Sequence, residues 1–144
     1  MPKMSVGKPV QALLITLPIA VFGFPQDRAG GDAASRAQSP IAGVWRGNSE
    51  CTVKDSPCHD EVNVYRFSEI AEKAGRYSGT ASKVVNGKEV DMGTLEWTYE
   101  AQKHALESEF ARGKFRLIID GNKIEGTLTL PDHTLYRRIH LRKD

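Results

Sequence analysis

The residues best suited to do chemistry are crowded together, because Cys51, Cys58, His59, Asp60 and Glu61 all lie between positions 51 and 61. Such residues form either a disulfide or a metal site. Zinc sites usually place paired ligands two to four positions apart on both arms, whereas the two cysteines lie seven apart. Covalent haem is also disfavoured, since no Cys stands three positions before Cys58. We therefore predict a Cys51–Cys58 disulfide, with no metal ligands and no cofactor.

No catalytic motif stands out elsewhere in the chain. The sequence contains no Gly-x-Ser-x-Gly elbow, no phosphate-binding glycine loop and no two histidines at metal-binding spacing. Glu107 and Glu109 form an acidic pair, but alternation places both opposite Leu106 and Phe110. Solvation explains such a pair better than acid–base work. We therefore predict a protein that is not an enzyme.

The first part of the chain has the features of a secretion signal, which we assign to residues 1–24. Lys3 and Lys8 precede an apolar run over residues 10–24 that is too short for a span of about 20 residues and contains Pro18. An uncleaved membrane anchor is the alternative. Residues 25–40, rich in Ala, Gly, Ser, Asp and Arg, are expected to form a flexible mature N-terminus. These features predict a secreted or periplasmic monomer without a stable membrane anchor, and export makes the disulfide chemically favourable.

Charge gives no reason to expect a nucleic-acid partner. The chain has 20 Lys and Arg against 18 Asp and Glu, and the excess consists of Lys3 and Lys8 in the predicted signal. A mature domain without net charge lacks the electrostatic attraction on which nucleic-acid binding depends.

The elements that must position any site are short strands, which we predict from alternating apolar residues across residues 41–144. In residues 93–101, Leu95, Trp97 and Tyr99 share one face. Equivalent alternation marks the runs 41–53, 62–70, 76–85, 104–110, 114–119, 123–130 and 135–141. Turn chemistry separates several of these runs, most clearly at Asn86-Gly87, which suits a type I′ hairpin. A single helical turn is expected over residues 69–75.

About eight strands in sequence order predict an all-β fold, a small antiparallel up-and-down β-barrel of eight strands. Closure removes the exposed edges of such a sheet. A two-sheet β-sandwich is the alternative.

The chain resembles the calycin group of lipocalin-like barrels at Gly43-x-Trp45, since the first strand of those proteins opens with Gly-x-Trp and their last strand often places an Arg across that Trp. Alternation points Arg137 inward together with Ile139 and Leu141. A buried guanidinium needs partners, and an indole face with nearby carbonyls would supply them. The resemblance therefore implies that Trp45 packs against Arg137.

The same resemblance implies a small apolar ligand bound at the open end of the barrel. The candidate ligand-binding residues are Tyr77, Trp97, Tyr99, Phe110, Phe115 and Arg137, with Leu95, Leu106 and Leu117 as further lining residues. Alternatively, these side chains simply fill the interior, because an eight-stranded barrel holds its own side chains or one small ligand. Glycines 79, 93 and 126 either open space or allow the strands to coil. A carrier requires an internal cavity of a few hundred Å³.

The chain is also similar to small periplasmic barrels that inhibit secreted proteases or lysozyme. Bacterial inhibitors of secreted metalloproteases share the signal, the flexible mature N-terminus, the Gly-x-Trp strand and a Cys shortly after it. In this hypothesis residues 25–40 form the inserting arm, Cys51 is the matching cysteine, and the partner is a secreted hydrolase.

Overall fold

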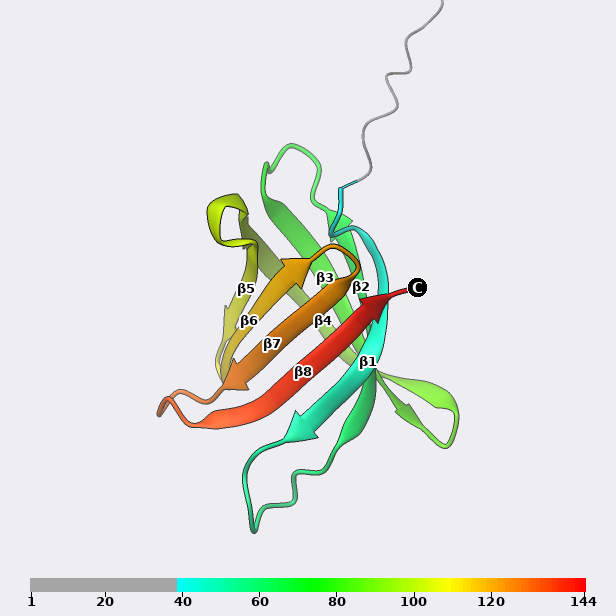
Figure 1. The fold of residues 1–144 in the computed structure, drawn as a ribbon, viewed down its shortest axis with the longest axis vertical. Coiled ribbons are helices and arrows are strands. Elements are labelled where there is room, and N and C mark those ends of the chain that lie inside the picture. The colour runs from blue at the N-terminus through cyan, green and yellow to red at the C-terminus, as the bar shows by residue number, and fades with distance from the viewer. Residues whose placement is uncertain (1–38) are drawn as a thin grey trace, which may run out of the picture. The chain divides into compact units, whose positions relative to one another are not determined.

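The computed structural model describes residues 39–144, which form one closed antiparallel barrel of eight strands in sequence order (Figure 1). The strands are β1 (Gly43–Cys51), β2 (Glu61–Glu69), β3 (Arg76–Val85), β4 (Lys88–Glu100), β5 (Ala105–Phe110), β6 (Gly113–Asp120), β7 (Lys123–Thr129) and β8 (Leu135–Lys143). Pairing of β1 with β8 closes the barrel, which confirms the predicted up-and-down fold and excludes the sandwich. The predicted signal at 1–24 and nearly all of the predicted flexible segment at 25–40 lie outside the described residues.

Helical structure is minimal in the described part of the chain. Residues 69–75, where a helical turn was expected, form the end of β2 and a pair of turns. The one helical element among residues 39–144 is the 3-10 turn η1 (Ala101–Lys103), which connects β4 to β5. No helix in this region is long and apolar enough to cross a membrane.

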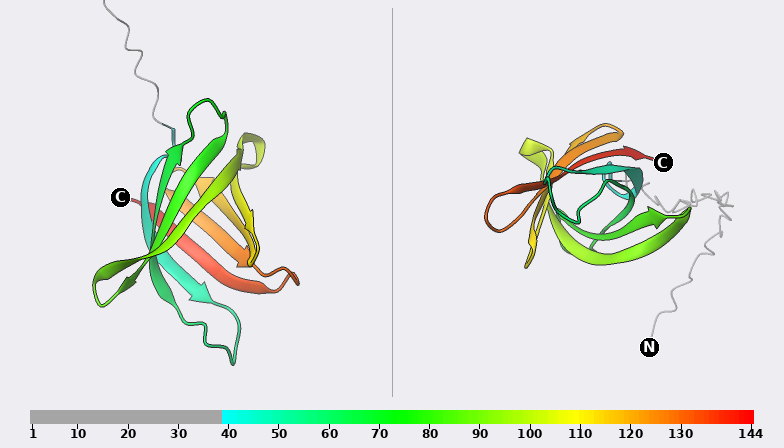
Figure 2. Two further views of the ribbon diagram at one scale, coloured as in Figure 1. Left: turned by 180° about the vertical axis from the view of Figure 1, so that it is seen from behind. Right: turned by 90° about the horizontal axis from the view of Figure 1, so that it is seen from below.

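Antiparallel order sorts the connections between strands onto two ends of the barrel (Figure 2). One end, here called the capped end, carries the β2–β3 and β6–β7 turns and η1. The other, here called the cavity end, carries the β1–β2 loop with the two cysteines, the tip of the β3–β4 hairpin and the β5–β6 and β7–β8 turns. Asn86 and Gly87 both have positive φ, as the predicted type I′ turn requires.

The capped end is closed by the segment before β1. Ile41 and Trp45 are both fully buried, and Trp45 Nε1 donates a hydrogen bond of 2.8 Å to the carbonyl of Ile41. Ser39 makes a 2.7 Å hydrogen bond with the hydroxyl of Tyr77 on β3. Of the described residues before β1, Ile41 is thus part of the core, and Ser39 is bonded to the barrel wall.

The predicted packing of Trp45 against Arg137 is wrong, because the cation over the indole is Lys143. Lys143 Nζ lies 5.4 Å from the centroid of the Trp45 ring and donates a 2.9 Å hydrogen bond to the carbonyl of Pro40. The reason is register: across β1 and β8, Trp45 pairs with Lys143, whereas Arg137 pairs with Cys51 at the other end of the barrel. Arg137 and Lys143 share the same parity, so alternation alone does not distinguish them.

The barrel wall is incomplete between β4 and β5. β3 pairs with β4 along its whole length, but β5 pairs with β4 only from Thr98 to Glu100. Within residues 39–144, the remainder of that β4 edge has no strand beside it, and the tip of the β3–β4 hairpin projects beyond the barrel in both views (Figures 1 and 2). The cavity end is therefore the more open end of the fold.

A disulfide joins Cys51 to Cys58 with Cα atoms 5.8 Å apart, as the sequence predicts. Because both sulfurs are bonded to each other, the thiolates that the metal-site alternative needs are consumed. The bond closes the loop between β1 and β2 at the cavity end.

Removing this disulfide with the pair Cys51→Ala and Cys58→Ala is expected to lower the free energy of unfolding by about 2–3 kcal/mol, the loop-closure entropy of a short ring. Urea denaturation followed by circular dichroism measures the change. The unsubstituted protein in reductant is the control and should match the double variant. Equal stability of oxidised and reduced protein would contradict the prediction.

Candidate functional site

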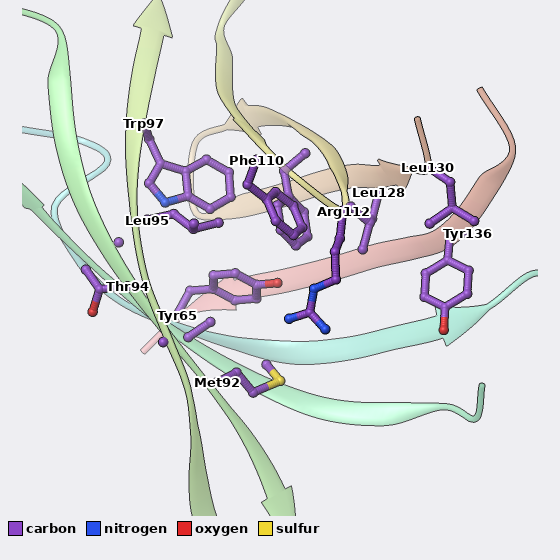
Figure 3. A pocket seen from close by; sticks show the side chains of 14 residues that line it. Tyr65, Met92, Thr94, Leu95, Trp97, Phe110, Arg112, Leu128, Leu130 and Tyr136 are labelled. Carbon is purple, nitrogen blue, oxygen red and sulfur yellow. The ribbon is translucent and has the colours of Figure 1, made fainter. Parts of the chain in front are cut away.

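A cavity of about 520 Å³ opens at the cavity end, in the part of the wall where β4 and β5 separate (Figure 3). Its lining residues are Tyr65, Gly79, Ala81, Met92, Gly93, Thr94, Leu95, Trp97, Phe110, Arg112, Phe115, Leu128, Leu130 and Tyr136. The set is dominated by aromatic and aliphatic side chains, and it contains one charged residue, Arg112. A concave, largely apolar site of this volume is typical of small-molecule pockets.

Packed aromatic rings form one wall of the cavity. Phe110 stacks on Phe115 at 5.5 Å between centroids, and Phe115 lies 5.4 Å from Trp97. Trp97 in turn meets Tyr65 and Phe67 edge-on, at 6.4 and 5.4 Å. Trp97 and Tyr65 are 1% and 2% exposed, so this wall is continuous with the core. An aromatic surface held in fixed geometry can bind a flat or apolar molecule with little loss of conformational entropy.

Two β-bulges place extra residues on the cavity. In β4, Ala81 and Ser82 of β3 pair with Gly93 and Asp91, so Met92 is an extra residue between them. In β8 the register shifts opposite Leu128 and Thr129, which leaves Tyr136 as the extra residue. Bulges of this kind redirect a side chain and occur often at barrel rims. Both extra residues line the cavity, and Figure 3 shows their side chains at its edge.

Two glycines make room for this arrangement in different ways. A Cβ at Gly79 would overlap Trp97 Nε1 and the ring of Phe67, so Gly79 allows these rings to pack against the strand. Gly93 has φ +108° and no atom within 4 Å of its ideal Cβ position, so it serves the bulge and leaves open space. The prediction that these glycines open space holds at Gly93; at Gly79 and Gly126 neighbouring atoms occupy the position of a Cβ, so these two permit close packing, which neither alternative included.

The polar groups at the cavity are few and of donor character. Arg112, in the turn between β5 and β6, is exposed and makes no ion pair or hydrogen bond with any residue from 39 to 144. Burial raises the pKa of Tyr65 far above its ordinary value, with a nearby Arg137 opposing this shift and Glu61 adding to it. The Tyr65 hydroxyl is therefore neutral and able to donate a hydrogen bond. Trp97 Nε1 is fully buried without a partner, behind the cavity surface.

The structure brings together only some of the predicted ligand-binding residues. Trp97, Phe110 and Phe115 line the cavity, as does Leu95. Tyr77 and Tyr99 do not line it, because they lie near the capped end and pack edge-on against each other at 6.5 Å. Leu106 and Leu117 are fully buried in the core, so for them the filled-interior alternative is correct. The interior is thus solid toward the capped end and hollow toward the cavity end.

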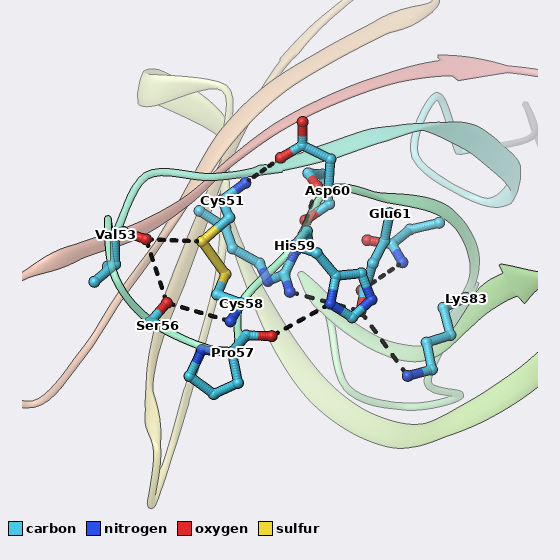
Figure 4. A network of polar contacts seen from close by, with 12 residues as sticks. Cys51, Val53, Ser56, Pro57, Cys58, His59, Asp60, Glu61 and Lys83 are labelled. Carbon is cyan, nitrogen blue, oxygen red and sulfur yellow. Dashed lines mark hydrogen bonds and ion pairs between the residues drawn. A yellow bond between two sulfur atoms is a disulfide. The ribbon is translucent and has the colours of Figure 1, made fainter.

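Arg137 does not line the cavity; it ties the disulfide loop to the barrel. Figure 4 shows this loop with its disulfide and with His59 and Glu61. Its Nη1 lies 3.2 Å from the carbonyl of Ser49 and 3.1 Å from that of His59, and donates to both. Its Nη2 lies 3.6 Å from Glu61, which is also 3.9 Å from Lys83. Arg137 does point inward, as alternation predicts. Its partners are backbone carbonyls and the carboxylate of Glu61, and not the indole of Trp45.

Sequence reasoning did not predict eight of the lining side chains: Tyr65, Ala81, Met92, Thr94, Arg112, Leu128, Leu130 and Tyr136. Tyr65 and Leu128 belong to alternating runs, so parity could have identified them. Met92 and Tyr136 owe their positions to bulges, of which Gly93 beside Met92 is the one visible sign. Arg112 lies in a two-residue turn, where no periodicity applies.

No family model matches this chain. A search of curated proteins also finds no relative with significant similarity. The site must therefore be interpreted from its own geometry.

Proposed function

We propose that this domain is an exported, non-catalytic binding protein that holds a small apolar molecule in the cavity at the cavity end. The observation that carries the proposal is the cavity itself, about 520 Å³ in volume and walled by Trp97, Phe110 and Phe115. Its volume lies within the range typical of ligand sites, of about 300–1,000 Å³. The resemblance to lipocalin-like barrels supports the same function, because it implies a ligand at the open end.

Export is part of the proposal and is supported by the chemistry of the chain. A disulfide such as Cys51–Cys58 persists in oxidising compartments and is rare in the cytosol. The signal predicted over residues 1–24 accounts for how the chain would reach such a compartment. The alternative function, inhibition of a secreted hydrolase through an arm at 25–40, depends mainly on residues outside the described part and stays a prediction.

Binding can be tested with N-phenyl-1-naphthylamine, a neutral apolar dye that becomes fluorescent in apolar sites. We expect a saturable fluorescence increase with one site per chain. Native mass spectrometry of protein purified from its own cells is a second measurement, and should display a retained small molecule. A dye that shows no saturable binding, together with a mass spectrum without adduct, would contradict the proposed function.

A substitution that fills the cavity should remove binding without unfolding the protein. Ala81 lies on the cavity wall opposite Gly93, and the indole introduced by Ala81→Trp would occupy the open volume. We expect loss of saturable dye binding, with the far-ultraviolet circular dichroism of a β-protein retained. Thr98→Trp is the matched control, because Thr98 is exposed and does not line the cavity. Unchanged dye binding by Ala81→Trp would place the dye elsewhere.

A further inference from the structure

Arg112 differs from the other arginines of the described chain in its surroundings. Five of them lie within ion-pair distance of carboxylates: Arg46, Arg66, Arg76, Arg116 and Arg137. Arg138 and Arg142 make no ion pair within residues 39–144 and are exposed along β8 outside the cavity lining. Arg112 alone among these eight borders the cavity, and it does so without a carboxylate partner.

The position of Arg112 is set by the tight connection between two paired strands. Phe110 and Gly113 pair with each other, so Ala111 and Arg112 form the whole turn. Figure 3 shows the Arg112 side chain extending over the cavity, with its guanidinium facing the space between Tyr65 and Met92. The charge is therefore held at the edge of an apolar chamber by a short turn and not by a long loop.

A second polar group, which is deeply buried, faces the same space. Tyr65 is 2% exposed, lines the cavity and makes no side-chain hydrogen bond within residues 39–144. In Figure 3 its hydroxyl points toward the side of the cavity that Arg112 covers. No Asp or Glu occurs among the lining residues, so nothing in the cavity wall neutralises the guanidinium. The Tyr65 hydroxyl has no protein partner among the described residues and faces the cavity, so it is free to donate a hydrogen bond to a bound molecule.

We infer that the cavity selects apolar molecules that carry one anionic group, a carboxylate being the simplest, with the anion bound by Arg112 at the mouth and the apolar body against the Trp97 wall. This inference rests on the proposed binding function and adds the class of ligand. Arginine suits the task because its planar guanidinium can donate two parallel hydrogen bonds to a carboxylate. Because Arg112 is exposed, its pairing with an anion contributes modestly to affinity and mainly gives selectivity, while the apolar wall contributes the rest.

The test compares decanoate with 1-decanol, which share an alkyl chain and differ in charge. Each is titrated against bound N-phenyl-1-naphthylamine, with decanoate kept below its micelle-forming concentration. We expect Arg112→Gln to lower the affinity for decanoate about 5- to 10-fold, because the substitution removes charge-assisted hydrogen bonds at a partly exposed site. Binding of decanol and of the dye should change by less than about twofold, because neither needs a charged partner. Added salt should weaken the binding of decanoate to the unsubstituted protein more than its binding to the variant, because salt screens the charge of Arg112.

Two further variants make the test specific. Arg142→Gln removes the same charge at the capped end of β8 and should leave decanoate binding unchanged. Arg112→Lys keeps the charge but loses the bidentate geometry, so it should retain part of the preference for decanoate. Equal effects of Arg112→Gln on decanoate and decanol, or no effect on either, would overturn the inference while leaving dye binding intact. Absence of dye binding to the unsubstituted protein would instead overturn the proposed function.

Discussion

Replacing Trp45 with alanine should lower the free energy of unfolding by about 3–5 kcal/mol, the range for deleting a fully buried aromatic side chain. Trp45 has no exposed surface and belongs to the main hydrophobic cluster. The substitution also removes the indole donor to the carbonyl of Ile41, and with it the attachment of the segment that closes the capped end. Urea denaturation followed by circular dichroism at a backbone wavelength gives the value without relying on tryptophan fluorescence.

The neighbouring cation provides the matched comparison. Lys143→Met keeps an apolar stem over the indole and removes only the ammonium, so the loss should be below about 1 kcal/mol. A loss below 1 kcal/mol for Trp45→Ala itself would show that Trp45 does not belong to the core. A loss from Lys143→Met as large as that from Trp45→Ala would mean that the ion, and not the indole, closes this end.

The barrel could be predicted because period-two polarity is a local property of each strand. In β7, Ile124 and Leu128 are buried while Lys123 and Glu125 are exposed, as alternation requires. The dipeptide Asn86-Gly87 predicted the hairpin turn between β3 and β4, and both residues have the positive φ that a type I′ turn needs. Closure followed from counting strands, since eight strands with one apolar face and no long crossover can close on themselves.

The site was predicted only in part, because alternation gives the face of a side chain but not its height along the barrel axis. Trp97 and Tyr99 share a face and are two residues apart, yet only Trp97 borders the cavity. Height depends on register between strands that are distant in sequence, and register also separates Arg137 from Trp45. The bulge residues Met92 and Tyr136 are harder still to predict from sequence. Each is an extra residue in its strand and interrupts the alternation of inward and outward side chains.

Arg137 provides the second large effect, and its partners explain why. The side chains of Arg137 and Glu61 are each 13% exposed, so the two groups face each other largely out of water. Arg137→Met would leave Glu61 with the imidazole of His59 at 3.8 Å, Lys83 at 3.9 Å and the amide of Asn63 at 3.5 Å. It would also leave the Ser49 and His59 carbonyls without this donor. Breaking a largely buried pair from one side is costly, and we expect a loss of about 2–4 kcal/mol in the free energy of unfolding.

The same substitution should have a local effect that distinguishes it from general core damage. Arg137 joins β8 to the β1–β2 loop through His59, so its loss should speed amide hydrogen exchange over residues 52–60 more than in β6 or β7. Arg138→Met is the control, because Arg138 is exposed on the next position of β8 and should change stability by less than about 0.5 kcal/mol. Equal stability losses from the two variants, or unchanged exchange in the loop, would show that Arg137 does not hold the disulfide loop. Arg137 would then pack through its aliphatic stem with its guanidinium in solvent, and the loop would be held by its disulfide and by the hydrogen bonds of Thr52 to β8.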